Sequence, residues 1–395
     1  MNPVLQQALE RLAEAPADPG DPPALLLWEL RATLRGETGD GTPSVASDGG
    51  WRAEWGPERG RRWRFVVGAG PQASILAGRR TPGRRWLDPR GWDAAVSAMD
   101  GALRLEFGSL RSAADALAAA RAAGSGPLGR VAIEIHLRWR AWRRGDAAPR
   151  HAEDRGFRLV LRGSDGGTPP AEGLDGAGRP GTRPGPLVLL APAAGWWVHE
   201  MGHAALESAP ENGLVRAFHG LAIVDDPAAG SWPAGFTIDD AGDRARAATL
   251  WDGTGPHAPA PRGRRRRPSV RDAAKGALSV TRLVGEATGG FDWSDLPEGT
   301  PVAAGVRAGR FDPPTGLIAL ELEGVGSVRD GSHHPGSGRA VALVQATEGW
   351  RGLRTLRAGP AEGDATLATC SRQGAMVPVM VGAPTIVLDP VRVIP

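Results

Sequence analysis

Two histidines and a glutamate lie close together in the sequence, at His199, Glu200 and His203. Residues four positions apart lie on one face of an α-helix, so both imidazoles can hold one metal ion from the same side. Zinc is the ion that two imidazoles and a third ligand favour, and the adjacent carboxylate can take a proton from an activated water molecule. The alternative is a pair of core histidines. A chain of this composition should match the pattern by chance only on the order of 0.01 times.

A third metal ligand must come from elsewhere in the chain. The longer zinc-protease pattern would place a glycine and a histidine where this chain has Leu206 and Ala209, so that pattern is excluded. Asp225 and Asp226 are possible carboxylate ligands, and the single cysteine, Cys370, is another. A lone cysteine is by default a small buried apolar residue. The residue types alone therefore leave the choice open.

The residues that flank the motif in the sequence predict the secondary structure around it. A short apolar strand is predicted over residues 187–190, and a helix over residues 196–208, which Pro210 and Gly213 end. The rest of this half consists of short apolar runs separated by turn pairs such as Asp330-Gly331, which predicts antiparallel strands. These runs are Leu221–Val224, Phe236–Ile238, Leu317–Leu322, Ala340–Val344 and Val377–Val381.

The first half of the chain combines helices with strands. Residues 1–15 and 92–123 are helix-like, while residues 131–140 and 157–161 alternate with the period of an antiparallel strand pair. The alternation places Trp139 in the core and Arg138 and Arg140 outside it. Residues 163–186 are dense in Gly, Pro and Asp and indicate a linker. We therefore predict an α+β fold, with an N-terminal helix-and-sheet domain over residues 1–184 and a largely antiparallel β-rich domain over residues 185–395 that carries the metal-binding helix.

Composition limits the possible functions. The chain has 395 residues, and its 57 Gly and 35 Pro favour strands and turns over a helical bundle. No apolar run is long enough for a membrane span, and because residues 1–15 have neither a basic start nor an apolar core, we expect no export signal. A single Cys suits a reducing compartment, so we expect a cytoplasmic protein without membrane contact. The 47 basic and 44 acidic residues are interspersed, so no nucleic-acid partner is expected.

Two further groups of residues are candidates for substrate contact. Arg262 and the basic run Arg264, Arg265, Arg266 and Arg267 form a patch that is either a solvated loop or a site for a carboxylate, a phosphate or a peptide end. His333 and His334 follow a turn, where loop residues often contact substrates. Three of the other histidines, His136, His151 and His257, have the patterns of solvated strand or loop residues.

The second half of the sequence resembles the TldD/PmbA peptidase family. Residues 188–207 are similar to its metal-site segment, and residues 223–227 and 236–242 to its paired Asp-Asp segments. Residues 312–316 and 328–331 resemble its late strands and turn, and residues 370–385 its closing pattern of Cys, Val-Pro-Val, Gly and Pro-Thr. The resemblance covers residues 187–395 in order. The first half is similar only in its helix-then-strand layout and is short for the family.

The resemblance implies a site and an activity. The family's zinc ligands correspond to His199, His203 and Cys370, and its catalytic base to Glu200. The family usually has three residues between the glutamate and the second histidine, whereas this chain has two, which an undistorted helix accommodates without a π-bulge. The implied activity is cleavage of unstructured or modified peptides, bound extended along a strand edge, by a heterodimer with a related TldE/PmbA-like subunit that lacks the metal motif.

Two alternatives compete with a zinc peptidase. The chain could be a catalytically inactive, peptide-binding partner subunit, which the shortened motif favours and the retained Glu200 and Cys370 oppose. It could also be a metal-stabilised scaffold, which requires a closed site with a fourth protein ligand such as Asp225 or His219.

Overall fold

The computed structural model describes residues 2–14, 25–37, 42–54, 64–68, 92–123, 130–145, 147–162, 184–207, 220–230, 233–257, 262–267, 275–285, 290–357, 366–372 and 375–394. These form two compact units. The first unit is Met1–Gly166 with two later segments, Ser231–Arg244 and Arg265–Lys275; the second is Gly167–Gly230, Ala245–Arg264 and Gly276–Pro395. Two segments after residue 184 therefore belong to the first unit, so the predicted single boundary at residues 184–185 does not separate the two units. Most of the expected linker, residues 163–183, lies outside the described residues.

The first unit contains a five-stranded antiparallel sheet with strand order β3-β2-β1-β4-β5. Its elements are α1 (Pro3–Glu14), β1 (Leu25–Glu37), β2 (Ser44–Glu54), β3 (Arg64–Gly68), α2 (Trp92–Ala123), β4 (Arg130–Arg143) and β5 (Arg150–Arg162).

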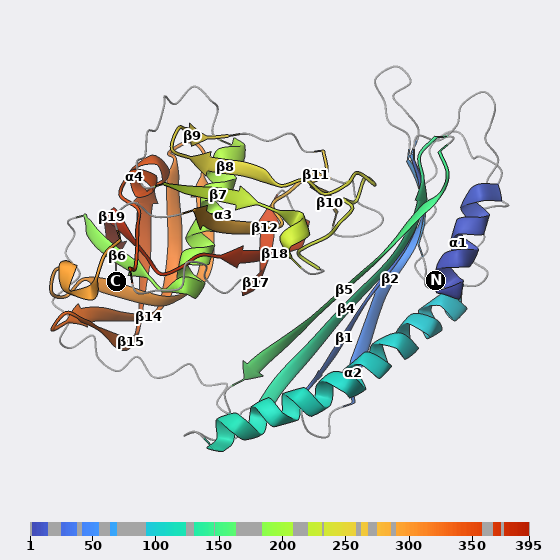
Figure 1. The fold of residues 1–395 in the computed structure, drawn as a ribbon, viewed down its shortest axis with the longest axis horizontal. Coiled ribbons are helices and arrows are strands. Elements are labelled where there is room, and N and C mark those ends of the chain that lie inside the picture. Colours follow the sequence, from blue (N-terminus) through green and yellow to red (C-terminus); the bar gives the residue numbers. More distant parts are fainter. Residues whose placement is uncertain are drawn as a thin grey trace. The chain divides into compact units, whose positions relative to one another are not determined.

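The two helices of this unit cover one face of the sheet (Figure 1). One apolar cluster joins Leu12 of α1 and Met99 of α2 to Leu30 of β1 and Ile133 of β4. Alternate residues of a strand share a face, so the period of two in β4 supplies the apolar surface that the helices bury. The predicted strand pair is confirmed, because β4 and β5 run antiparallel.

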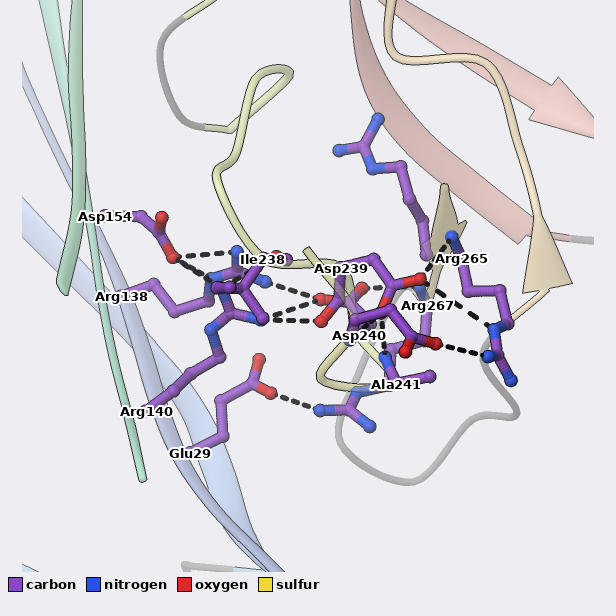
Figure 2. A network of polar contacts seen from close by, with 12 residues as sticks. Glu29, Arg138, Arg140, Asp154, Ile238, Asp239, Asp240, Ala241, Arg265 and Arg267 are labelled. Carbon is purple, nitrogen blue, oxygen red and sulfur yellow. Dashed lines mark hydrogen bonds and ion pairs between the residues drawn. The ribbon is translucent and has the colours of Figure 1, made fainter. Parts of the chain in front are cut away.

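The opposite face of this sheet is charged, yet it is also buried. Arg138 and Arg140 are 0% and 2% exposed, so the prediction that they lie outside the core is wrong. The reason is that residues 238–243 of the same unit cover them. Arg138 donates to Asp240 at 2.5 Å, and Arg140 donates to the carbonyl oxygen of Asp239 at 3.0 Å (Figure 2).

We call this group the charged cluster. Its members are Glu29, Arg31, Arg138, Arg140, Asp154, Asp239, Asp240, Asp243, Arg265 and Arg267.

The second unit is built from two six-stranded sheets and one central helix. Its strand orders are β17-β18-β12-β7-β8-β9 and β15-β14-β13-β6-β19-β16, and an additional β15–β19 pairing closes the second sheet on itself. Most pairs are antiparallel, while β12–β18 and β13–β6 are parallel. The strands are β6 (Gly185–Leu189), β7 (Leu221–Asp225), β8 (Ala248–Asp252), β9 (Gly255–Pro256), β12 (Val280–Gly285), β13 (Pro301–Asp312), β14 (Leu317–Arg329), β15 (Ser332–Gln345), β16 (Arg354–Thr355), β17 (Thr366–Arg372), β18 (Ala375–Gly382) and β19 (Ile386–Ile394).

The remaining elements of the chain are one long helix, α3 (Ala191–Glu207), and several short elements. The short ones are α4 (Ala346–Arg351), the 3₁₀ turns η1 (Pro227–Ala229) and η2 (Trp293–Asp295), and the two-stranded pair β10 (Arg265–Arg266) and β11 (Lys275–Gly276). Helix α3 packs against β13 and β14 of one sheet and against β7, β8, β12 and β18 of the other. Because it has neighbours on all sides, most of its residues are buried, including Trp197, Met201 and the metal motif.

The α+β fold class with a largely antiparallel second half is confirmed. The predicted motif helix corresponds to α3, and the predicted helix over 92–123 to α2. The turn at Asp330-Gly331 is also found, with φ values of 50° and 64° that suit a two-residue hairpin. The predicted strand at Phe236–Ile238 is wrong, since only an isolated bridge from Ile238 to Arg244 forms there. Within the part of the chain that the structure describes, no helix is long and apolar enough to cross a membrane.

Candidate metal centre

The structure brings together His199 and His203 of α3 and Cys370 of β17. Nε2 of His203 lies 3.1 Å from Nε2 of His199 and 3.2 Å from Sγ of Cys370. The ligand atoms of all three residues lie within 4.8 Å of one another, and all three side chains are buried. We call these residues the metal centre. Among the described residues, this is the one group of three or more potential ligands close enough to share an ion.

Two of the three ligand pairs lie near the separations of a tetrahedral zinc site. Bonds of about 2.0 Å to nitrogen and about 2.3 Å to sulfur would separate two nitrogens by roughly 3.3 Å and a nitrogen from a sulfur by roughly 3.5 Å. The distances of 3.1 and 3.2 Å lie a few tenths of an ångström inside these values. A hydrogen-bonded trio explains the contacts less well, because His203 Nε2 carries either one lone pair or one N–H, and only a weaker three-centre hydrogen bond could serve both the imidazole and the thiol.

The fold explains how residues so distant in sequence meet. Helical spacing puts His199 and His203 on one face of α3, and their rings are 4.6 Å apart. Cys370 belongs to β17, which pairs with β18. Helix α3 approaches β18 closely at Gly195, where an added Cβ would lie 3.1 Å from backbone atoms of Val381. A side chain at this position would push the helix away from the strand pair that carries Cys370.

Two neighbours hold His199. The hydroxyl of Thr281, in β12, lies 3.4 Å from its Nδ1, and the ring of Trp196 meets the imidazole edge-on with centroids 6.2 Å apart. With the proton on Nδ1 and donated to Thr281, Nε2 is the nitrogen left to bind a metal. The sequence did not indicate Thr281 as a site residue. It lies in an ordinary apolar run, and only the pairing of β12 with β7 and β18 places it beside α3.

Glu200 also lies on α3 and is 4% exposed. It directly follows His199, so its side chain leaves the helix about 100° round from that imidazole. Its carboxylate end lies against Gly309 of β13, where an added Cβ would come within 2.9 Å of its Cγ and Oε1. A buried carboxylate on the same helix as two histidines of a His-His-Cys group is a combination expected of a hydrolytic metal site.

The alternative carboxylate ligands are engaged elsewhere. Asp225 accepts hydrogen bonds from the backbone and hydroxyl of Ser279 at 2.9 and 3.0 Å and forms an ion pair with Arg264 at 2.7 Å. Asp226 caps the η1 turn by accepting from the backbone of Ala228. Neither belongs to the metal centre. His219, the other candidate for a fourth ligand, lies outside the described residues.

The basic run is not the solvated loop that was one of its two interpretations. Arg264, Arg266 and Arg267 are 3%, 5% and 2% exposed. Arg264 pairs with Asp225, Arg265 with Asp243 at 2.6 Å, and Arg267 with Glu29. Arg266 donates to the carbonyl of Pro233 and lies over the ring of Phe236. These internal partners give no support to the prediction that the run binds a substrate carboxylate.

His333 and His334 begin β15, next to the hairpin turn. His333 is partly buried and stacks on Trp293 with ring centroids 5.6 Å apart, while His334 is exposed. Burial, with a smaller contribution from His334, lowers the pKa of His333. Neither residue is part of the metal centre, and their contact with a substrate stays a prediction.

Comparisons with known proteins agree with the fold. No family model and no curated protein matches the sequence. Among solved structures, TldE from Thermococcus kodakarensis matches 99% of this chain and 100% of its own, with a TM-score of 0.54 and 13% identity. The chain has the fold of TldE. A proposed modulator of a DNA gyrase from Thermotoga maritima matches 98% of this chain and 99% of its own, with a TM-score of 0.58 and 12% identity.

A third structure, a proposed modulator of DNA gyrase from Bacteroides thetaiotaomicron, matches 99% of this chain and 98% of its own, with a TM-score of 0.50 and 13% identity. The TldE-like fold is the one that the TldD/PmbA resemblance implies, and it extends over the first half of the chain as well. The expectation that this half is short does not hold against TldE, which is matched over its full length. Identities this low show the fold and not the activity.

Proposed function

We propose that this chain is a zinc-dependent peptidase, the metal-bearing subunit of a TldD/PmbA-type pair. The observation that carries the proposal is the meeting of His199, His203 and Cys370 within 4.8 Å, where the next residue after His199 on helix α3 is the buried Glu200. An inactive subunit has no need to keep three ligands and a carboxylate in this arrangement. Three protein ligands leave a tetrahedral position open, which a scaffold site would close with a fourth.

The residues have separate roles in peptide hydrolysis. The two imidazoles and the Cys370 thiolate would hold the zinc. When bound, zinc supplies a water molecule of lowered pKa and polarises the carbonyl of the bond to be cut. Glu200 would take up a proton at its carboxylate during attack on the peptide carbonyl. It then gives the proton to the amine nitrogen as the C–N bond breaks.

The partner and the substrate follow from the resemblance. A related TldE/PmbA-like subunit would complete the enzyme, and the likeness to TldE over the whole chain supports a partner of the same fold. The substrate would be an unstructured or modified peptide, bound extended with weak side-chain specificity. The likeness to TldE also favours the second candidate, a peptide-binding subunit without catalysis, so the test must separate the two.

Zinc content is the first measurement. We expect about one zinc per chain in the wild type and a large loss in Cys370→Ser and His203→Ala. His334→Ala is the matched control, because it removes an exposed histidine outside the metal centre and should keep the zinc. A wild type that takes up no zinc would contradict the proposal and leave the peptide-binding subunit as the better interpretation.

Peptide cleavage is the second measurement, made with the candidate partner present. Glu200→Gln keeps the size of the side chain but cannot accept the proton, so we expect full zinc content and at least about a 100-fold loss of kcat. Equal cleavage by wild type and Glu200→Gln would show that this carboxylate is not the base.

A further inference from the structure

The space beside Glu200 is set by one residue of a neighbouring strand. Gly309 of β13 lies so close that a Cβ built on it would be 2.9 Å from both Cγ and Oε1 of Glu200 and 3.2 Å from Cδ. Real Cβ atoms are not found this close to another heavy atom, so the carboxylate occupies the volume that any other residue at 309 would fill. All three atoms nearest to that Cβ belong to the Glu200 side chain, so this side chain is the group that an added Cβ would displace.

An irregularity in β13 aims this glycine at the helix. Val306 lies opposite Leu322 of β14, but beyond it the register shifts by one residue, so Gly309 lies opposite Leu320 and Phe311 opposite Ile318. Residues opposite each other share a face of the sheet, and these β14 residues belong to the apolar core that contains α3.

Without the shift, the alternation would turn Arg310 toward the helix in place of Gly309. β-Bulges often redirect side chains beside active sites in this way.

We propose that Gly309 is a positioning residue for the general base, and that the bulge before it exists to present a residue without a side chain to Glu200. This inference rests on the proposed peptidase function and adds to it the residue that sets where the base lies. The three heavy atoms nearest to a Cβ built at Gly309 all belong to Glu200. The role of Gly309 is to leave the space against the strand that the Glu200 carboxylate occupies.

Gly309→Ala tests this role directly, and a second glycine of β13 provides a matched control. Gly305 lies on the same strand, and a Cβ there would meet nothing nearer than the Cβ of Glu323 at 4.0 Å. Neither glycine has a positive φ, so alanine is tolerated by the backbone at both positions. Any general effect of Gly→Ala in a strand should therefore appear equally in Gly305→Ala.

Activity is the first readout. Because a misplacement of about 1 Å costs roughly 100-fold in rate, Gly309→Ala should lower kcat about 100-fold with KM and zinc content unchanged. Gly305→Ala should keep wild-type kcat. A Gly309→Ala enzyme as active as Gly305→Ala would overturn the inference.

Thermal stability is the second readout and does not depend on activity. Alanine at 309 should lower Tm by on the order of 3 °C when Glu200 is present, and equally in Glu200→Gln, which has the same size. In Glu200→Ala the clash is gone, so the same substitution should leave Tm unchanged. Additive Tm changes would overturn the inference, even with lowered activity. If the wild type cuts no peptide at all, the proposed function fails, and this cycle alone still decides whether Gly309 positions Glu200.

Discussion

The first unit buries charged side chains of both signs in the charged cluster, whereas the second unit buries two imidazoles, a thiol and a carboxylate in and beside the metal centre. In the charged cluster every carboxylate faces an arginine: Asp154 pairs with Arg138 at 2.8 Å and Asp243 with Arg265 at 2.6 Å. In the metal centre the three ligand atoms are all electron-pair donors that point at one another.

The charged cluster and the metal centre differ in what offsets the free-energy cost of burying their polar side chains. Burial alone would raise the pKa of Asp240, but Arg138, Arg31 and Arg267 outweigh it and lower the pKa to about 2. Burial would likewise raise the pKa of Glu29, yet Arg267 and Arg31 hold it well below its usual range. At these two carboxylates the chain's own arginines outweigh burial, whereas at Asp239 burial prevails and raises the pKa. On the proposed function, the metal centre would gain its stabilisation from a bound ion, whereas the charged cluster is stabilised by ion pairs within the chain.

Removing one charge from the charged cluster should give the largest effect on stability. In Asp240→Asn the side chain keeps its size, but Arg138 and Arg31 lose a buried counter-charge. We expect a loss of about 3–5 kcal/mol in the free energy of unfolding, because breaking a buried pair leaves an uncompensated charge. Urea unfolding of the full chain measures it.

The control is the same substitution at an exposed pair. Asp100 of α2 pairs with Arg104 at 2.8 Å on the helix surface, and Asp100→Asn should cost less than about 0.5 kcal/mol. If both variants lose equally little, the charged cluster does not hold the first unit together and the contrast with the metal centre disappears.

The sequence predicted the metal centre better than the charged cluster. His199, Glu200 and His203 are close in sequence, and helical spacing alone predicts their shared face. Cys370 lies 167 residues beyond His203, so residue types left it one candidate among several and only the family resemblance selected it. Gly309 could not be predicted, because its role depends on a register shift within β13.

The prediction that Arg138 and Arg140 lie outside the core was wrong because the residues that bury them come from far along the chain. The alternation of β4 correctly predicted that Trp139 and Arg138 lie on opposite faces. It could not show that Asp240, 102 residues later, buries the polar face. The predicted strand at Phe236–Ile238 failed for the same reason, since the carbonyl oxygen of Ile238 accepts from Arg140 rather than from a neighbouring strand.

Lowering the pH should reduce the stability that the charged cluster contributes. Folding lowers the pKa of Asp240 from 3.8 to about 2, so its stabilisation is present above the unfolded value and is lost as the pH falls from about 3.8 toward 2. The difference corresponds to about 2 kcal/mol. Urea midpoints at pH 5, 3.5 and 2.5 should fall more steeply in the wild type than in Asp240→Asn. Parallel curves would mean that Asp240 carries no charge-dependent stability.

The smallest expected effect concerns Thr281, whose hydroxyl lies near Nδ1 of His199. In Thr281→Val the shape of the side chain stays, but the oxygen 3.4 Å from Nδ1 of His199 is lost. A ligand histidine held less firmly by its outer nitrogen binds metal less tightly, so the zinc Kd, measured by competition with a chelator, should rise about 10-fold.

Thr300→Val makes the same change at another buried threonine, whose hydroxyl donates to the carbonyl of Pro297, and should leave the zinc Kd unchanged. An equal zinc Kd in the two variants would show that Thr281 does not orient His199. The metal centre would then depend on its three ligands alone, without the surrounding hydrogen bonds that complete the charged cluster.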